Sequence, residues 1–124
     1  MAFLCQIHSG GSPGEHWVVS ERPLVVGRGE FADAYIDDDA LSRSHFLIVR
    51  EAAAFFLVDL DSRNGTRVNG RSVSAHRLQP NEIIQAGESL FCFCLALKPG
   101  PGLPVPVSVL KNYIATSWQP VQTG

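Results

Sequence analysis

The stretch from Asp59 to Gly70 constrains the fold of this chain more than any other, because it contains two Asn-Gly pairs. Asn-Gly is the strongest short-range turn signal, since both residues tolerate a positive φ at little cost. An apolar run, residues 55–58, precedes the stretch, and residues 66–68 between the two pairs are just long enough for a short strand. The pattern predicts a strand, a firm polar loop at Asn64-Gly65, a short strand, and a reversal into another strand.

Further short strands are predicted along the chain, each bounded by clusters of Gly, Pro, Asn or Asp. With those of the opening stretch, their ranges are residues 2–8, 16–20, 24–26, 35–36, 46–50, 53–60, 66–68, 72–73, 82–85 and 89–97. No segment before residue 105 shows a convincing helical period. Many short strands with such turn residues between them indicate an all-β sandwich. The last strand is apolar on both faces, which predicts a place inside a sheet that is covered on each side.

The composition changes after residue 98, where prolines and glycines become frequent. Proline lacks the backbone donor that a ladder needs, so the segment after Lys98 reads as a stiff, extended linker. We assign residues 1–98 to one domain and residues 99–124 to this Pro/Gly-rich linker and a short tail. In the tail, apolar residues from Val107 to Trp118 have roughly helical spacing. Three alternatives stay open for it: a helix folded back on the sandwich, a segment awaiting a partner, or a truncated next domain.

Charge and hydropathy argue against several classes of function. A formal net charge of −2 disfavours a general nucleic-acid binder, which would show a basic excess. No window approaches the roughly 18 uninterrupted apolar residues of a membrane span. The first residues lack the basic flank and the length of a signal peptide. We therefore expect neither nucleic acid nor a membrane as a partner.

Three cysteines, Cys5, Cys92 and Cys94, lie in apolar, strand-like runs. Cys92 and Cys94 are two positions apart on one strand and share a face, which disfavours a disulfide between them. No Cys-x-x-Cys pair or histidine cluster accompanies them, so we predict buried reduced thiols, with no metal site and no cofactor. Reduced thiols indicate a reducing compartment, and we predict a cytoplasmic protein.

Three polar groups, each in a predicted loop between strands, are candidates for chemistry: Gly27-Arg28, residues 42–45 (Ser-Arg-Ser-His) and Arg63-Asn64. Arginine offers a planar, permanently charged fork, serine can donate to an anion, and asparagine can pair with a peptide backbone through both its carbonyl and its amide. Each group alone has an ordinary structural explanation. For His45 we prefer one, in which its ring hydrogen bonds tie the loop down. Loops at one end of a sandwich can converge, and this combination in this order is specific.

The three groups resemble the pattern of the forkhead-associated (FHA) domain: Gly-Arg, then Ser-x-x-His, then Asn-Gly before a short strand. The resemblance covers residues 2–97, approximately. It implies an eleven-stranded antiparallel β-sandwich that binds phosphothreonine peptides through loops at one end and is not an enzyme. The partner that it implies is a phosphothreonine-containing protein, the product of a Ser/Thr kinase.

The resemblance also implies a role for each site residue. Arg28 corresponds to the phosphate-binding arginine and Ser42 to the hydroxyl that donates to the phosphate. Arg43 adds a phosphate or peptide contact, Asn64 clamps the peptide main chain, and Arg63 lines the same groove. Positions that are architectural in the family, and not ligand contacts, are Gly27, His45, Gly65 and Thr66. Charge-assisted hydrogen bonds of about 1.5–3 kcal/mol each would give roughly micromolar affinity.

Two other classes of function fit the sequence less well. A hydrolase would pair Ser42 or Ser44 with His45 and Asp59, but the Gly-x-Ser-x-Gly elbow is absent and adjacency in sequence does not make a triad. The other hypothesis is a phosphate-independent structural or assembly module, for example in a bacterial secretion or regulatory complex. Some FHA-like domains of this kind have lost the arginine or the serine. This chain retains Arg28, Ser42 and Asn64, which favours binding.

Self-association and peptide selectivity depend on residues outside these three groups. The tail of one chain, phosphorylated at Thr116, could dock into a second copy and give weak self-association, but an ordinary exposed threonine is the preferred interpretation. The acidic run Asp37-Asp38-Asp39 would disfavour acidic peptide residues if it faced the groove, whereas Arg63 would favour them. The selectivity for flanking residues stays open.

Overall fold

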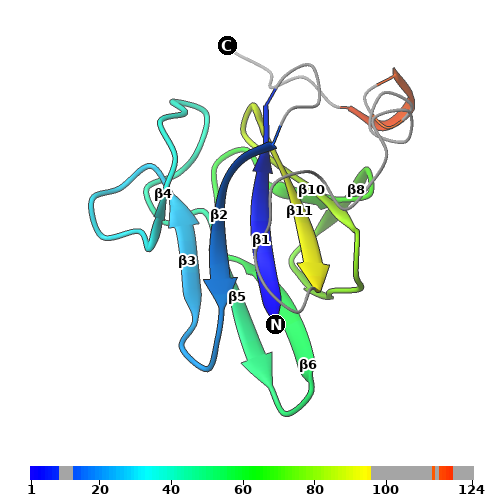
Figure 1. Ribbon diagram of the computed structural model, residues 1–124. Coiled ribbons are helices and arrows are strands. Elements are labelled where there is room, and N and C mark those ends of the chain that lie inside the picture. Colours follow the sequence, from blue (N-terminus) through cyan, green and yellow to red (C-terminus); the bar gives the residue numbers. More distant parts are fainter. Residues whose placement is uncertain (9–12, 96–112, 114, 119–124) are drawn as a thin grey trace.

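The computed structural model describes residues 1–8, 13–95, 113 and 115–118, and these form a sandwich of two β-sheets (Figure 1). These residues contain eleven strands, the number that the FHA resemblance implies. The predicted all-β sandwich is therefore confirmed. No helix in this part of the chain combines the length and the apolar character needed to cross a membrane.

One sheet has six strands in the order β2-β1-β11-β10-β7-β8. Its strands are β1 (Ala2–Ile7), β2 (Pro13–Val19), β7 (Thr66–Val68), β8 (Arg71–Val73), β10 (Ile83–Ala86) and β11 (Ser89–Leu95). The other sheet has five strands in the order β4-β3-β5-β6-β9. Its strands are β3 (Leu24–Gly27), β4 (Ala34–Tyr35), β5 (Phe46–Glu51), β6 (Ala54–Asp59) and β9 (Ala75–Arg77). Strands β3 and β4 run parallel, so the predominantly antiparallel sandwich contains one parallel pair among the described strands.

The core lies between the sheets and is built from the alternate side chains of each strand, as the strand period of two requires. Phe46 of β5 and Phe91 of β11 are fully buried and meet edge to face, with ring centroids 5.8 Å apart. Strand β11 lies between β1 and β10, and both of its faces are covered. Phe91 and Phe93 face the core, whereas Leu90 and Cys92 belong to a second apolar cluster on the outer face. The prediction of a mid-sheet strand covered on both sides is confirmed.

Part of the tail covers this outer face. Tyr113 is only 7 % exposed and packs in the second cluster, and Trp118 packs against the same cluster. Residues 115–117 are helical. Ser117 lies next to Gly70 in the turn between β7 and β8, since a Cβ atom on Gly70 would be 3.0 Å from Cβ of Ser117. Of the three alternatives for the tail, the described residues show a helical piece folded back on the sandwich. The linker predicted from residue 99 lies outside the described residues, and the division at residue 98 stays a prediction.

Two parts of the strand pattern differ from expectation. Strand β9 was not predicted, because the sequence Ala75-His76-Arg77 carries no apolar alternation; it forms by pairing with the edge of β6. Strand β2 begins at Pro13, inside the segment predicted as a loop. A proline is tolerated there because β2 is an edge strand and Pro13 is its first residue.

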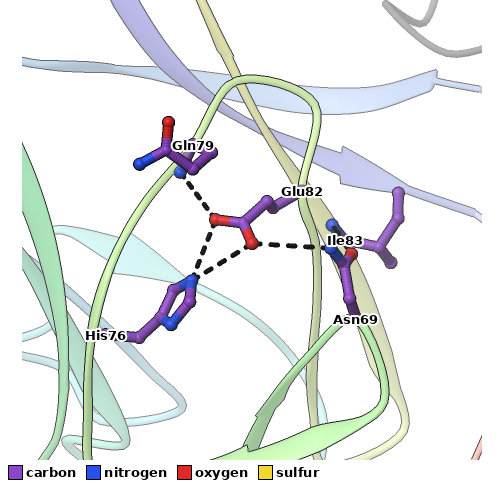
Figure 2. Close-up of polar contacts among 5 residues, drawn as sticks. All are labelled: Asn69, His76, Gln79, Glu82 and Ile83. Carbon is purple, nitrogen blue, oxygen red and sulfur yellow. Dashed lines mark hydrogen bonds and ion pairs between the residues drawn. The ribbon is translucent and has the colours of Figure 1, made fainter.

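The two sheets are joined by a polar cluster near the turn between β7 and β8 (Figure 2). Nε2 of His76 in β9 hydrogen-bonds to Oε1 of Glu82 at 3.0 Å. The same carboxylate accepts a hydrogen bond from the Gln79 backbone at 2.6 Å and one from the Asn69 amide at 3.4 Å. Asn69 in turn accepts a hydrogen bond from the backbone nitrogen of Ile83 at 2.9 Å. The carboxylate of Glu82 and the side-chain amide of Asn69 are thus both bonded by the chain itself.

Candidate functional site

The loop after β3 and the loop before β5 are joined through their backbones. The backbone nitrogen of Arg28 donates to the carbonyl of Ser42 at 3.2 Å, and that of Gly29 donates to the carbonyl of Arg43 at 3.0 Å. The two loops approach so closely that a Cβ atom on Gly27 would lie 2.1 Å from the carbonyl oxygen of Arg43. Only glycine fits at this position, which explains why a glycine precedes Arg28.

The loop between β6 and β7 joins the same group through side chains. The backbone nitrogen of Arg63 donates to Oγ of Ser42 at 3.0 Å. The guanidinium of Arg63 donates to the carbonyl of Asp39 at 3.1 Å, and the amide of Asn64 donates to the carbonyl of Ala40 at 2.8 Å. Three loops that are distant in sequence therefore converge at one end of the sandwich. The structure brings together all five residues named as candidates: Arg28, Ser42, Arg43, Arg63 and Asn64.

His45, which directly precedes β5, connects the loop of Ser42 to the loop of Gly65 through its ring nitrogens. Its side chain is fully buried. Its Nδ1 accepts a hydrogen bond from the backbone nitrogen of Ser42 at 3.0 Å, so in the neutral ring Nε2 carries the proton and donates to the carbonyl of Gly65 at 2.8 Å. Burial lowers the pKa of His45, against the opposing effects of the Gly65 carbonyl and of Asp59 and Asp38, and so favours this neutral form. The predicted structural role of His45 is confirmed.

Asp59, at the end of β6, organises the third loop, and its role was missed in the sequence. Its carboxylate accepts hydrogen bonds from the backbone and hydroxyl of Ser62, at 3.1 and 2.6 Å, and from the hydroxyl of Thr66 at 2.7 Å. Burial raises the pKa of Asp59, but these hydrogen bonds outweigh it, so the pKa lies below its ordinary value. The spacing Asp-x-x-Ser is a signal that could have indicated this role, because an aspartate often caps the turn that follows it.

Asp38 was also missed, since it lies in what reads as a solvated acidic run. Its carboxylate accepts hydrogen bonds from the backbone of Ala40 at 2.9 Å, the backbone of Glu88 at 2.9 Å and the hydroxyl of Ser89 at 2.7 Å. Asp38 thus fixes the loop before Ser42 to the turn between β10 and β11. Its carboxylate stabilises the loop that carries the site.

The side chains of the site retain hydrogen-bonding capacity toward solvent. Arg28 uses Nε to bond the carbonyl of Leu41 at 2.7 Å, which aims the guanidinium and leaves its terminal amino groups for an anion. Oγ of Ser42 accepts from Arg63, so its own proton can be donated outward. Arg43 is exposed, and Asn64 keeps its carbonyl oxygen and one amide proton. The arrangement can bind an anion through arginine and serine, and an extended main chain through asparagine.

The same geometry does not form a hydrolytic triad. Both ring nitrogens of His45 bond to the main chain, and the carboxylate of Asp59 bonds to Ser62 and Thr66. Neither His45 nor Asp59 is therefore placed to take the proton of Ser42 in the way that a serine nucleophile requires. Within the described ranges there is also no group of three His, Cys, Asp or Glu side chains that could hold a metal ion.

Comparison with known proteins agrees with the site geometry. The family model of the FHA domain matches residues 24–87. The chain is 30 % identical over 98 residues to the glycogen accumulation regulator GarA of Mycolicibacterium smegmatis, covering 79 % of this chain and 60 % of GarA. It is 33 % identical over 76 residues to the FHA domain-containing protein FhaA of Mycobacterium tuberculosis, covering 61 % of this chain and 14 % of FhaA.

A solved structure from a structural and functional analysis of phosphothreonine-dependent FHA domain interactions has the same fold. It superimposes with a TM-score of 0.70 at 27 % identity, covering 78 % of this chain and 98 % of the other. The chain spans less than two thirds of the length of GarA and of FhaA. The family match covers more than half of the chain, including all three converging loops. This chain belongs to the FHA domain family.

Proposed function

We propose that this chain is a binding module that recognises phosphothreonine in a partner protein through the three converging loops. The observation that carries the proposal is the convergence of Arg28, Ser42 and Asn64, each held by its own hydrogen bond and each with donors or acceptors left over. The related structure studied for phosphothreonine-dependent interactions supports the same ligand class. The partner is the product of a Ser/Thr kinase, and the binding takes place in the cytoplasm.

The phosphate is bound by Arg28, Arg43 and the hydroxyl of Ser42. A phosphothreonine carries nearly two negative charges and three acceptor oxygens at neutral pH, and arginine matches these oxygens with a planar fork of donors. Asn64 pairs with the peptide main chain beside the phosphothreonine. Arg63 contributes less to ligand binding than an arginine with a free guanidinium would, because its guanidinium also donates to the carbonyl of Asp39. The affinity is roughly micromolar, which suits reversible signalling.

The module is a binding protein and not an enzyme. The geometry around His45 supports this, because both ring nitrogens are occupied by backbone groups. Self-association through phosphorylated Thr116 stays a prediction. Thr116 is exposed in the helical part of the tail.

An oriented peptide library tests the proposal. Phosphothreonine, phosphoserine and unphosphorylated versions of the library are bound to the full chain at low and high salt. We expect binding that needs the phosphate and weakens with salt, since exposed ionic contacts are screened. Phosphate-independent capture, or no binding by folded protein, would favour the assembly module instead.

A further inference from the structure

All three cysteines lie on the outer face of the six-stranded sheet, but only two of them meet. Strand β1 pairs with β11 so that Cys5 is opposite Cys92, and Phe3 is opposite Cys94. Cys94 is therefore the diagonal neighbour of Cys5. Its Sγ nevertheless lies 3.0 Å from Sγ of Cys5. The thiol of Cys92 points to the carbonyl of Phe93 instead, with Sγ 3.8 Å from the oxygen.

We propose that Cys5 and Cys94 are a modification site, at which a peroxide joins the two thiols into an intramolecular disulfide. The three cysteines are free thiols in the structure. A disulfide bond is about 2.0 Å long, so the two sulfur atoms need to approach by about 1 Å. We expect rotation of the two side chains to provide this shift without a change in the pairing of β1 with β11.

The environments of the thiols assign their roles. Cys5 is half-buried and accessible to a small oxidant, whereas Cys94 is 6 % exposed and Cys92 is fully buried. The hydrogen bond with Cys94 lowers the pKa of Cys5, against the effect of burial, and so favours the reactive thiolate. Burial raises the pKa of Cys92 to about 12, which keeps this thiol protonated and unreactive. Cys5 is the attacking residue and Cys94 is its resolving partner.

The reaction balances with hydrogen peroxide as the oxidant. The thiolate of Cys5 attacks one peroxide oxygen, the O–O bond breaks, and the products are a sulfenic acid on Cys5 and hydroxide. The sulfur of Cys94 then attacks the sulfur of the sulfenic acid and displaces its hydroxyl group, which leaves as water with the thiol proton. The hydroxide takes up the proton that Cys5 had released. In total, two thiols and one peroxide give one disulfide and two waters.

The modification is separate from the proposed phosphopeptide site. None of the three cysteines contacts the loops of Arg28, Ser42 or Asn64 through an interaction among the described residues. The two partners are 89 positions apart in sequence, so the disulfide closes a long loop and restricts the unfolded chain. We therefore expect oxidation to raise the melting temperature and to leave phosphopeptide affinity unchanged.

The test treats the full chain with a small excess of hydrogen peroxide, alkylates the remaining thiols, and maps the cysteines by mass spectrometry with and without reduction. We expect a monomer that has lost two hydrogens, a peptide pair joining Cys5 to Cys94, and an alkylated Cys92. The variant Cys92→Ser is the matched control and should oxidise as the wild type does. Cys5→Ser and Cys94→Ser should each lose the intramolecular disulfide.

Three outcomes would overturn the proposal: three alkylated cysteines after oxidation of folded protein, a disulfide between Cys5 and Cys92, or a disulfide between two chains. Mapping of the wild-type protein decides among them even where a serine variant folds poorly. The result is also independent of phosphopeptide binding, so failure of one proposal does not affect the other.

Discussion

The two Asn-Gly turns at the two ends of β7 have the same sequence and opposite roles. At the first, only Gly65 has a positive φ, of 79°, and the chain crosses from the five-stranded sheet to the six-stranded sheet. At the second, both residues have positive φ, 48° for Asn69 and 85° for Gly70, and the chain makes a tight hairpin between β7 and β8. The second turn has the geometry that Asn-Gly most favours.

The hydrogen bonds of the two asparagines also differ. Asn64 is exposed and bonds the carbonyl of Ala40, which leaves its own carbonyl oxygen for a ligand. The carbonyl and amide of Asn69 are both used by the chain, in bonds to Ile83 and Glu82 (Figure 2). The comparison teaches that the dipeptide specifies a turn, whereas the neighbouring loops decide whether its asparagine is available for binding. Substitution of Asn64 should therefore affect binding, and substitution of Asn69 should affect stability.

The largest effect is expected for Arg28→Ala. This substitution removes a charged contact from the three converging loops, to which the first Asn-Gly turn belongs. Phosphopeptide binding should weaken by about 2–5 kcal/mol, the usual loss when one partner of a charged pair is truncated. The fold should be retained, because a loop arginine contributes little to the core. Isothermal titration calorimetry measures the affinity and circular dichroism the fold. Arg71→Ala, an exposed arginine just after the second turn, is the matched control and should bind normally.

His45→Ala should cost about 2–4 kcal/mol of the free energy of unfolding, because it leaves the Ser42 amide and the Gly65 carbonyl without their partner. Thermal unfolding followed by circular dichroism measures this loss, with the exposed His8→Ala as the control. A variant that melts like the wild type but fails to bind would mean that His45 contacts the ligand.

His45 also gives the stability a pH dependence. Burial lowers its pKa below the unfolded value of 6.5, so between these two values the unfolded chain binds more protons than the folded chain. The stabilisation by neutral His45 is therefore fully present above pH 6.5 and is lost as the pH falls toward the lowered pKa. We expect urea unfolding to show a decrease in stability below pH 6.5 that is smaller in His45→Ala.

The two asparagines provide the most direct test of the comparison. Asn64→Ala should weaken phosphopeptide binding by about 1–2 kcal/mol through lost main-chain contacts, with little change in melting temperature. Asn69→Ala should bind normally and lose about 1–2 kcal/mol of stability, since it removes the bond to Ile83 and places alanine at positive φ. If both variants lost affinity to the same extent, the division of roles between the turns would be wrong.

Effects on stability are expected for the two glycines. Gly65→Ala should lose about 1–2 kcal/mol of stability from backbone strain alone, because no atom lies within 4 Å of the added Cβ. Gly70→Ala should lose more, since its Cβ would also lie 3.0 Å from Cβ of Ser117 in the tail. Equal melting temperatures for the two variants would contradict the contact between the tail and the second turn.

Much of the strand pattern is readable in the sequence because it rests on local rules. Turn residues mark where strands end, and the apolar residues of β11 on both faces indicate that it is covered on each side. Strand β9 is different, because Ala75-His76-Arg77 has no local preference and is ordered by its pairing with β6. A strand of this kind depends on its neighbour and cannot be found from propensity alone.

The sequence by itself determined the sandwich class and the three groups of candidate residues, because turns, strand periods and the Gly-Arg, Ser-x-x-His and Asn-Gly pattern are local features. Only the tertiary structure decided that Arg28, Ser42 and Asn64 lie at one end with unused donors and acceptors. Only it assigned structural roles to Asp38 and Asp59, and paired Cys5 with its diagonal neighbour. These are contacts between segments far apart in the chain, and the packing of the two sheets, not the spacing of residues, fixes their distances.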